Sequence, residues 1–85
     1  MVRTKEWQLR LELTEDGDLT TVHAVLDTGE GVLETISSAR RNPLDARVPQ
    51  IGDEFAAGRA LVELGHQLLR AGTAEATGND PAARE

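Results

Sequence analysis

The sequence predicts an α+β fold in which a three-stranded antiparallel meander packs against one C-terminal amphipathic helix. Residues 5–13 and 19–27 alternate apolar and polar side chains, as a strand with one buried face does, and residues 32–39 form a third strand. Two short turns join the strands, so neighbouring strands pair antiparallel. Residues 53–71 then place their apolar side chains at helical spacing, and this one helix must cover the apolar face of the sheet. The outline is similar to that of double-stranded RNA-binding domains.

The first strand has the clearest inner face, because every second residue is large and apolar: Trp7, Leu9, Leu11 and Leu13. We expect this row to lie beneath the helix. In the second strand, one face holds Thr20, Val22, Ala24 and Leu26. In the third strand we expect the row of smaller side chains to face the helix, namely Leu33, Thr35, Ser37 and Ala39. The opposite row, which contains Ile36, then faces outward.

Both turns are rich in glycine and in polar or acidic residues, which tolerate the left-handed conformations of tight turns; they cover residues 15–18 and 28–31. The string Gly29-Glu30-Gly31 begins like a phosphate-binding fingerprint. A third glycine is missing, however, and a strand follows it in place of a helix. We therefore interpret this string as a hairpin turn.

The helix is expected to run from about residue 53 to residue 71, with Asp53 or Gly52 as its N-cap and Gly72 as its end. Between Pro43 and Pro49 we expect a loop without a regular element. Residues 73–85 are small and polar, and we expect them to form a disordered tail behind a single domain at residues 1–72.

The predicted helix has more apolar surface than the sheet can cover. The stripe expected to face the sheet consists of Ala57, Ala60, Leu61, Leu64, Leu68 and Ala71. A second row, Phe55, Val62 and Leu69, lies more than about 100° away around the helix. Two interpretations are open: the row packs under the loop at 40–50, with Val48 and Ile51 as partners, or it forms a subunit interface.

Charge is distributed unevenly along the chain. The 85 residues include nine Lys and Arg against 15 Asp and Glu, which gives a net charge of −6 and argues against a basic, charge-driven nucleic-acid binder, so no DNA partner is expected. Three arginines, Arg40, Arg41 and Arg47, nevertheless share one loop. They either cap carbonyls and pair with Asp45 and Asp53, or they form a contact site for an anion, a partner or a charge-complementary dimer seam.

The small size of the chain favours self-association. It has one Trp, one Phe and no Tyr or Cys, so it can form only a small core and no disulfide, and short chains of this kind are often stabilised as oligomers. No apolar run approaches the roughly 20 residues that span a bilayer. The N-terminus also lacks the apolar core of a signal peptide, so we expect a cytoplasmic protein with no membrane contact.

The sequence offers no constellation typical of an enzyme. His23 and His66 lie on predicted polar faces, and neither belongs to a metal-binding motif. Ser37-Ser38 lacks the glycines of a nucleophile elbow, and we interpret both serines as small packing residues. We therefore predict no catalytic residue, no cofactor and no metal site.

Three strings carry a resemblance to a known family: Ala39-Arg40-Arg41-Asn42-Pro43, Val48-Pro49-Gln50-Ile51-Gly52-Asp53-Glu54 and Arg59-Ala60-Leu61-Val62-Glu63-Leu64. With Glu6-Trp7, they resemble small actinobacterial proteins of unknown function that are linked to dormancy or hypoxic stress. The resemblance covers about residues 5–70 and implies a β-β-β-α domain, often dimeric, with no established activity. The third strand departs from the family pattern, because Glu34 and Ser37-Ser38 stand where apolar residues and glycine are expected.

Together these features predict a non-enzymatic binding or regulatory domain that forms a homodimer and acts through a partner in stress or dormancy. The residues expected at the dimer interface are Phe55, Val62 and Leu69. The residues expected to contact a partner or an anion are Arg40, Arg41 and Arg47. The alternative is a ribosome- or RNA-associated hibernation-type factor that uses this arginine loop on phosphates.

Overall fold

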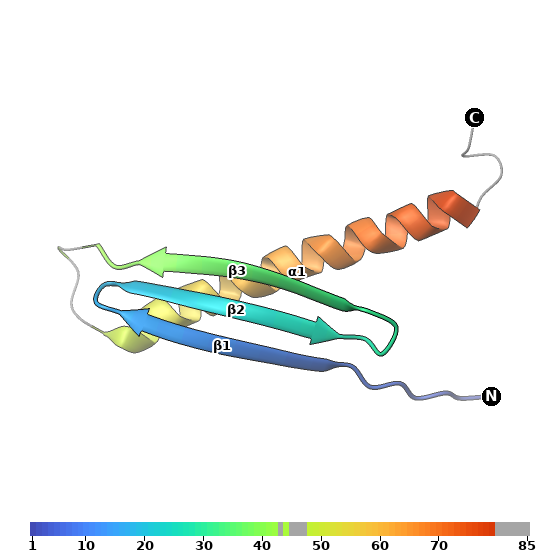
Figure 1. The fold of residues 1–85 in the computed structure, drawn as a ribbon, viewed down its shortest axis with the longest axis horizontal. Coiled ribbons are helices and arrows are strands. Elements are labelled where there is room, and N and C mark those ends of the chain that lie inside the picture. The colour runs from blue at the N-terminus through green and yellow to red at the C-terminus, as the bar shows by residue number, and fades with distance from the viewer. Residues whose placement is uncertain (43, 45–47, 80–85) are drawn as a thin grey trace.

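The computed structural model describes residues 1–42, 44 and 48–79, and it confirms the predicted fold class. The elements are β1 (Gln8–Asp16), β2 (Leu19–Asp27), β3 (Val32–Arg40) and α1 (Pro49–Asn79). The strands form one antiparallel sheet in the order β1-β2-β3. Figure 1 shows the sheet as one layer and α1 crossing one of its faces obliquely, with the end of the helix projecting beyond the sheet.

The strand register puts the predicted rows on a common inner face. Leu11 lies opposite Ala24, and Ala24 lies opposite Thr35. The four inner residues of the central strand are all buried: Thr20, Val22, Ala24 and Leu26. In β3 the row that contains Leu33 and Ala39 is the more buried one, and Ile36 is exposed on the outer face, as predicted.

The first strand begins and ends three residues later than predicted. Its pairing runs from Gln8 opposite Asp27 to Asp16 opposite Leu19, so residues 5–7 have no partner in β2. At the other end Gly17, with φ of 59°, takes a conformation that side chains disfavour. This tight turn lets the pairing continue through Asp16.

The inner face of β1 is where the sequence prediction was wrong. α1 packs on β2 and β3, and only Leu11 of the β1 row packs against the core. Trp7, Leu9 and Leu13 remain 49%, 47% and 41% exposed. A helix is about 10 Å wide and strands lie about 4.8 Å apart, so one helix covers about two strands and leaves the third partly open.

The core is small and rich in alanine. It consists of Val22, Ala24, Leu26, Ala39, Ala56, Ala60 and Leu64. Ala56 and Ala60 bring the helix close to the sheet, whereas Leu61, which the sequence predicts to face the sheet, is 43% exposed. The inward stripe is therefore rotated from the predicted one. Hydrogen bonds from Arg59 and Gln67 to carbonyls of β3 fix this rotation.

The helix is also longer than predicted at both ends. It begins at Pro49, a residue whose fixed φ suits the first turn of a helix, so neither Gly52 nor Asp53 is the N-cap. It continues through Gly72 to Asn79, because the segment after Gly72 contains good helix formers such as Ala74 and Ala76. Residues 73–79, predicted to be tail, are helical, and residues 80–85 lie outside the described part of the chain.

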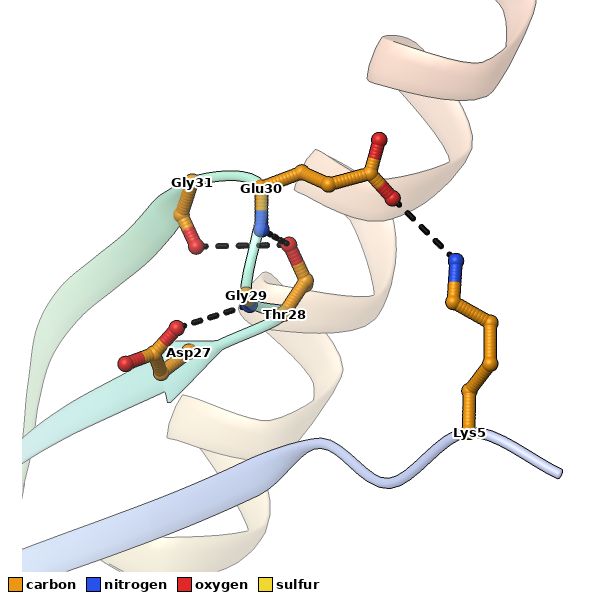
Figure 2. A network of polar contacts seen from close by, with 6 residues as sticks. All are labelled: Lys5, Asp27, Thr28, Gly29, Glu30 and Gly31. Carbon is orange, nitrogen blue, oxygen red and sulfur yellow. Dashed lines mark hydrogen bonds and ion pairs between the residues drawn. The ribbon is translucent and has the colours of Figure 1, made fainter.

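The turn between β2 and β3 is closed by its own polar groups (Figure 2). The Asp27 carboxylate accepts a hydrogen bond from the Gly29 N–H at 2.8 Å, and the Thr28 N–H donates to the Gly31 carbonyl at 3.0 Å. Gly29 has a φ of 83°, which favours glycine. Lys5 reaches the turn from the N-terminal segment and pairs with Glu30 at 3.3 Å. The prediction of a hairpin turn is confirmed.

Candidate interaction surfaces

The predicted row of Phe55, Val62 and Leu69 lies on the face of α1 that points away from the sheet. These side chains are 60%, 59% and 70% exposed, respectively. Phe55 lines a cavity together with Val48 and Ile51, which are the partners expected from the loop. Val62 and Leu69 lie further along the helix. Three large apolar side chains on one outward face are unusual for a monomeric surface helix.

Three glycines alternate with this row, and the sequence reasoning missed them. Gly58, Gly65 and Gly72 follow one another at intervals of seven residues, as the three apolar residues do. A Cβ placed on any of these glycines would meet no other atom within 4 Å. Glycine inside a helix costs about 1 kcal/mol relative to alanine. Packing among the residues that the structure describes therefore gives no reason for these three glycines.

Together the two rows form what we call the helix seam: Phe55, Gly58, Val62, Gly65, Leu69 and Gly72. Its members are separated alternately by three and four residues, which is the spacing of the contact positions in a coiled coil. A groove of about 420 Å³ lies along the seam. Glu63 lies beside it and pairs with Arg70 at 3.3 Å. The seven-residue repeat of the glycines was the signal in the sequence that could have revealed the seam.

Among the described residues, the loop arginines do not form one basic patch. Arg41 Nε donates to the Asp18 carboxylate at 2.9 Å, and its backbone N–H donates to the Asp18 carbonyl at 2.7 Å. Arg41 also caps the Asn42 carbonyl, so its side chain fastens the end of β3 to the turn between β1 and β2. Arg40 is exposed, and Arg47 lies outside the described residues, as does its predicted partner Asp45.

A cavity of about 460 Å³ lies at this end of the sheet, lined in part by Glu15, Arg40 and Phe55. Near it, the carboxyl groups of Glu15 and Asp53 interact. A hydrogen bond with Asp53 and the repulsion between the two charges raise the pKa of Glu15 above its usual value. The Oδ1 atom of Asp53 is buried without a hydrogen-bond partner in the described structure.

The histidines lie away from this acid pair. His23 contacts Glu34 on the outer face of the sheet at 2.9 Å, and His66 lies 3.9 Å from Glu63 on the helix. Within the described residues, no three His, Asp or Glu side chains are grouped so that they could hold a metal ion. The described part of the chain likewise has no helix both long and apolar enough to cross a bilayer.

Comparison with known proteins finds a family and relatives that match nearly the whole chain. A protein-family model described as Rv2632c-like matches residues 5–83. Uncharacterized protein Mb1767 of Mycobacterium bovis is 38% identical over 80 residues, which are 92% of this chain and 85% of the relative. Uncharacterized protein MT1780 of Mycobacterium tuberculosis has the same identity and coverage. The crystal structure of Rv2632c superimposes with a TM-score of 0.76 at 33% identity, covering 94% of this chain and 98% of that one.

Proposed function

The chain belongs to the Rv2632c-like family, and from this premise we propose that it is a small, non-enzymatic binding protein that works as a homodimer. The observation that carries the proposal is the helix seam. Large exposed side chains and helix-weakening glycines alternate there at coiled-coil spacing, and packing among the described residues accounts neither for the exposure of Val62 and Leu69 nor for the glycines. The simplest occupant of such a face is another helix that approaches closely.

The seam is complementary to itself when it is reversed. If two copies of α1 pack antiparallel with Val62 opposite Gly65 of the second copy, the same register places Phe55 opposite Gly72 and Leu69 opposite Gly58. Each large side chain then meets a position without a side chain, so that knobs enter holes along the whole seam. This self-complementarity is the reason to choose a second copy over an unrelated helix.

The projecting end of the helix supports the same arrangement. Leu68 is the last residue of α1 that packs against the core, whereas the helix continues to Asn79 beyond the sheet. An isolated helical end gains little stability by itself. In the antiparallel pair, Gly72 and its neighbours lie against the first turns of the second copy's helix, which covers this overhang.

The absence of enzyme activity is part of the proposal, and the placement of the polar groups supports it. The acid pair of Glu15 and Asp53 lies near the turn between β1 and β2, far along the molecule from His66. Ser37 is on the inner face of the sheet, under the helix. Nucleophilic catalysis requires a nucleophile, a base and an orienting group within hydrogen-bond reach of one another.

Val62→Glu tests the seam, and Val32→Glu is its matched control. Both valines are 59% exposed, but Val32 lies on β3. A charge at the centre of an apolar helix contact should raise the dissociation constant at least about 30-fold. Light scattering or sedimentation should therefore show fewer chains per particle for Val62→Glu and no change for Val32→Glu. A wild-type protein that is monomeric, or an equal effect of both substitutions, would overturn the proposal.

We propose that this binding function serves dormancy or hypoxic stress, because the chain resembles proteins linked to those conditions. The competing role on the ribosome or RNA has less support, since Arg41 already pairs with Asp18. Co-sedimentation with ribosomes at low and raised salt separates the two roles. Binding that is lost when Arg40 is changed to Glu and persists in Val62→Glu would favour the ribosomal role over the dimeric one.

A further inference from the structure

The two edges of the sheet are treated differently by the rest of the molecule. On β3, the Ser38 carbonyl accepts a hydrogen bond from Arg59 at 2.9 Å, and the Glu34 carbonyl accepts one from Gln67 at 3.2 Å. In the described part of the chain, no helix side chain makes such a bond to β1. Natural proteins usually protect edge strands, because an open edge can pair with another chain. The open edge here is nine residues long and contains no proline.

The register shows which groups β1 presents at this edge. The Arg41 N–H bonds the Asp18 carbonyl, and backbone groups of an antiparallel strand point alternately to its two sides. The backbone N–H and C=O groups of the odd-numbered residues of β3 therefore point toward β2. Those of Glu34 and Ser38 point to the outer edge of the sheet. Carried through the pairing of β2 with β1, the same alternation directs the backbone groups of Leu9, Leu11 and Leu13 outward.

We propose that β1 pairs with β1 of a second copy, antiparallel and centred on Leu11, so that two three-stranded sheets join into one of six strands. This register places Arg10 opposite Glu12 of the second copy, and Glu12 opposite Arg10. It also places Leu9 opposite Leu13 on the inner face. Each strand thus offers both members of a charge pair and both members of an apolar pair to its own copy.

The neighbouring registers are less favourable. In both copies the outward backbone groups belong to odd-numbered residues, so odd-numbered residues must pair with one another. The two-fold centre of the strand pair can therefore lie only at a residue, not between two residues. A centre at Glu12 puts that carboxylate opposite itself, and a centre at Arg10 puts two guanidinium groups together; like charges directly opposite each other are destabilising. Among these three neighbouring registers, charge complementarity therefore favours the one centred on Leu11.

The proposal also accounts for the part of the inner face that α1 leaves open. Leu9 and Leu13 are about half-exposed in one chain. In the joined sheet these residues from both copies form one continuous apolar strip, with both helices on the same side of it. The β1 edge is separate from the helix seam, so this inference does not depend on the proposed function. If both surfaces are used, four chains associate through two different two-fold contacts.

A charge swap tests the register directly. Arg10→Glu places like charges opposite each other at two symmetric positions, and so does Glu12→Arg. Each single variant should weaken pairing about tenfold or more, and the double variant Arg10→Glu/Glu12→Arg should restore it. Arg40→Glu makes the same change on β3 and should have no effect. Circular dichroism checks that every variant is folded.

Combination with Val62→Glu separates the two surfaces. If both surfaces are used, sedimentation should give wild type about four times the 9.2 kDa mass of one chain, Val62→Glu about twice, and Arg10→Glu/Val62→Glu a single chain. If Arg10→Glu leaves the mass of Val62→Glu unchanged at two chains, β1 pairing is wrong. If Val62→Glu has the same mass as wild type while Arg10→Glu lowers it, the seam is wrong and β1 pairing stands.

Cysteine cross-linking gives a geometric test, because the chain has no cysteine of its own. In the proposed register residue 8 lies opposite residue 14 of the second copy, at a Cα separation of about 4.5–5.5 Å, within reach of a disulfide. Within one strand these positions are about 20 Å apart. Gln8→Cys/Thr14→Cys should form a covalent dimer on oxidation, and neither single variant should. Equal cross-linking of a single variant, or none in the double variant, would contradict the register.

Discussion

Glu15 at the end of β1 and Asp53 in the second turn of α1 bring two carboxyl groups of like charge close together. Their interaction raises the pKa of Glu15 in the folded chain above its ordinary value of 4.5. A carboxyl whose pKa is raised on folding binds more protons in the folded state than in the unfolded state. The folded state therefore gains stability from this pair at low pH and loses it as pH rises through the raised pKa.

Asp53→Asn should remove this pH dependence. The amide keeps a group that can hydrogen-bond Glu15 but carries no charge, so the pKa of Glu15 should fall toward its ordinary value. The variant should be more stable than wild type at pH 7, with the difference shrinking at pH 4. Urea unfolding at the two pH values measures this, with the Glu15→Gln variant as a second route to the same result. A variant less stable than wild type at pH 7 would show that Asp53 has another structural role.

In α1, the stability of the helix and the proposed association place opposite demands on the glycines. Gly58, Gly65 and Gly72 weaken the helix, and the chain has open space where their side chains would be. The proposed seam needs that space for Phe55, Val62 and Leu69 of the second copy. Substitution at one glycine should therefore affect folding and association in opposite directions.

Gly65→Ala should stabilise the single chain by about 1 kcal/mol and weaken association through the seam. The first effect is measured by thermal unfolding in the Arg10→Glu/Val62→Glu background, and the second by sedimentation of Gly65→Ala alone. Gly31→Ala is a useful control, since this glycine also has open space around it but lies in a turn. Tighter association of Gly65→Ala would contradict the proposed helix pairing.

The elements also show how far sequence reasoning reaches in this chain. Alternation predicts which side chains of a strand share a face, and for Val22 and Leu26 the prediction of a common face is confirmed. Alternation carries no information on which strands a helix covers, so Leu9 and Leu13 were expected under α1. The predicted end of the helix at Gly72 is wrong, because Ala74, Glu75 and Ala76 favour helix and no proline interrupts residues 73–79.

The candidate surfaces were predicted only in part for a similar physical reason. Large apolar residues such as Val62 are conspicuous in a helical pattern, whereas glycines are usually interpreted as breakers and not as contact positions. The pairing of Arg41 with Asp18 joins residues 23 positions apart in the sequence, and only the register of β2 and β3 brings them together. The open edge of β1 likewise depends on where α1 lies.

At the scale of the whole molecule, the stability of one chain is limited by its core. Four of the seven core residues are alanines, whose side chains bury little area. The molecule measures 55 × 33 × 18 Å, so it is a thin, two-layer object with much surface for its volume. Burial at the seam and along β1 would add to this small core.

The midpoint of thermal unfolding should therefore rise with protein concentration. If folding and association are coupled, a tenfold increase in concentration should raise Tm by about 3–5 °C. Val62→Glu should reduce this slope, and Arg10→Glu/Val62→Glu should abolish it. Scanning calorimetry over a hundredfold range of concentration measures the slope. A wild-type Tm that is independent of concentration would mean that the single chain is stable without a second copy.

The order of the elements has a consequence for synthesis of the protein. Ala56, Ala60 and Leu64 supply the helical half of the core, and they emerge from the ribosome after all three strands. Until then Val22 and Leu26 have no cover, so the nascent meander is exposed to chaperones and proteases while the helix is still being made. A chain truncated before α1 would lack Ala56, Ala60 and Leu64, so its sheet would have no second layer to pack against.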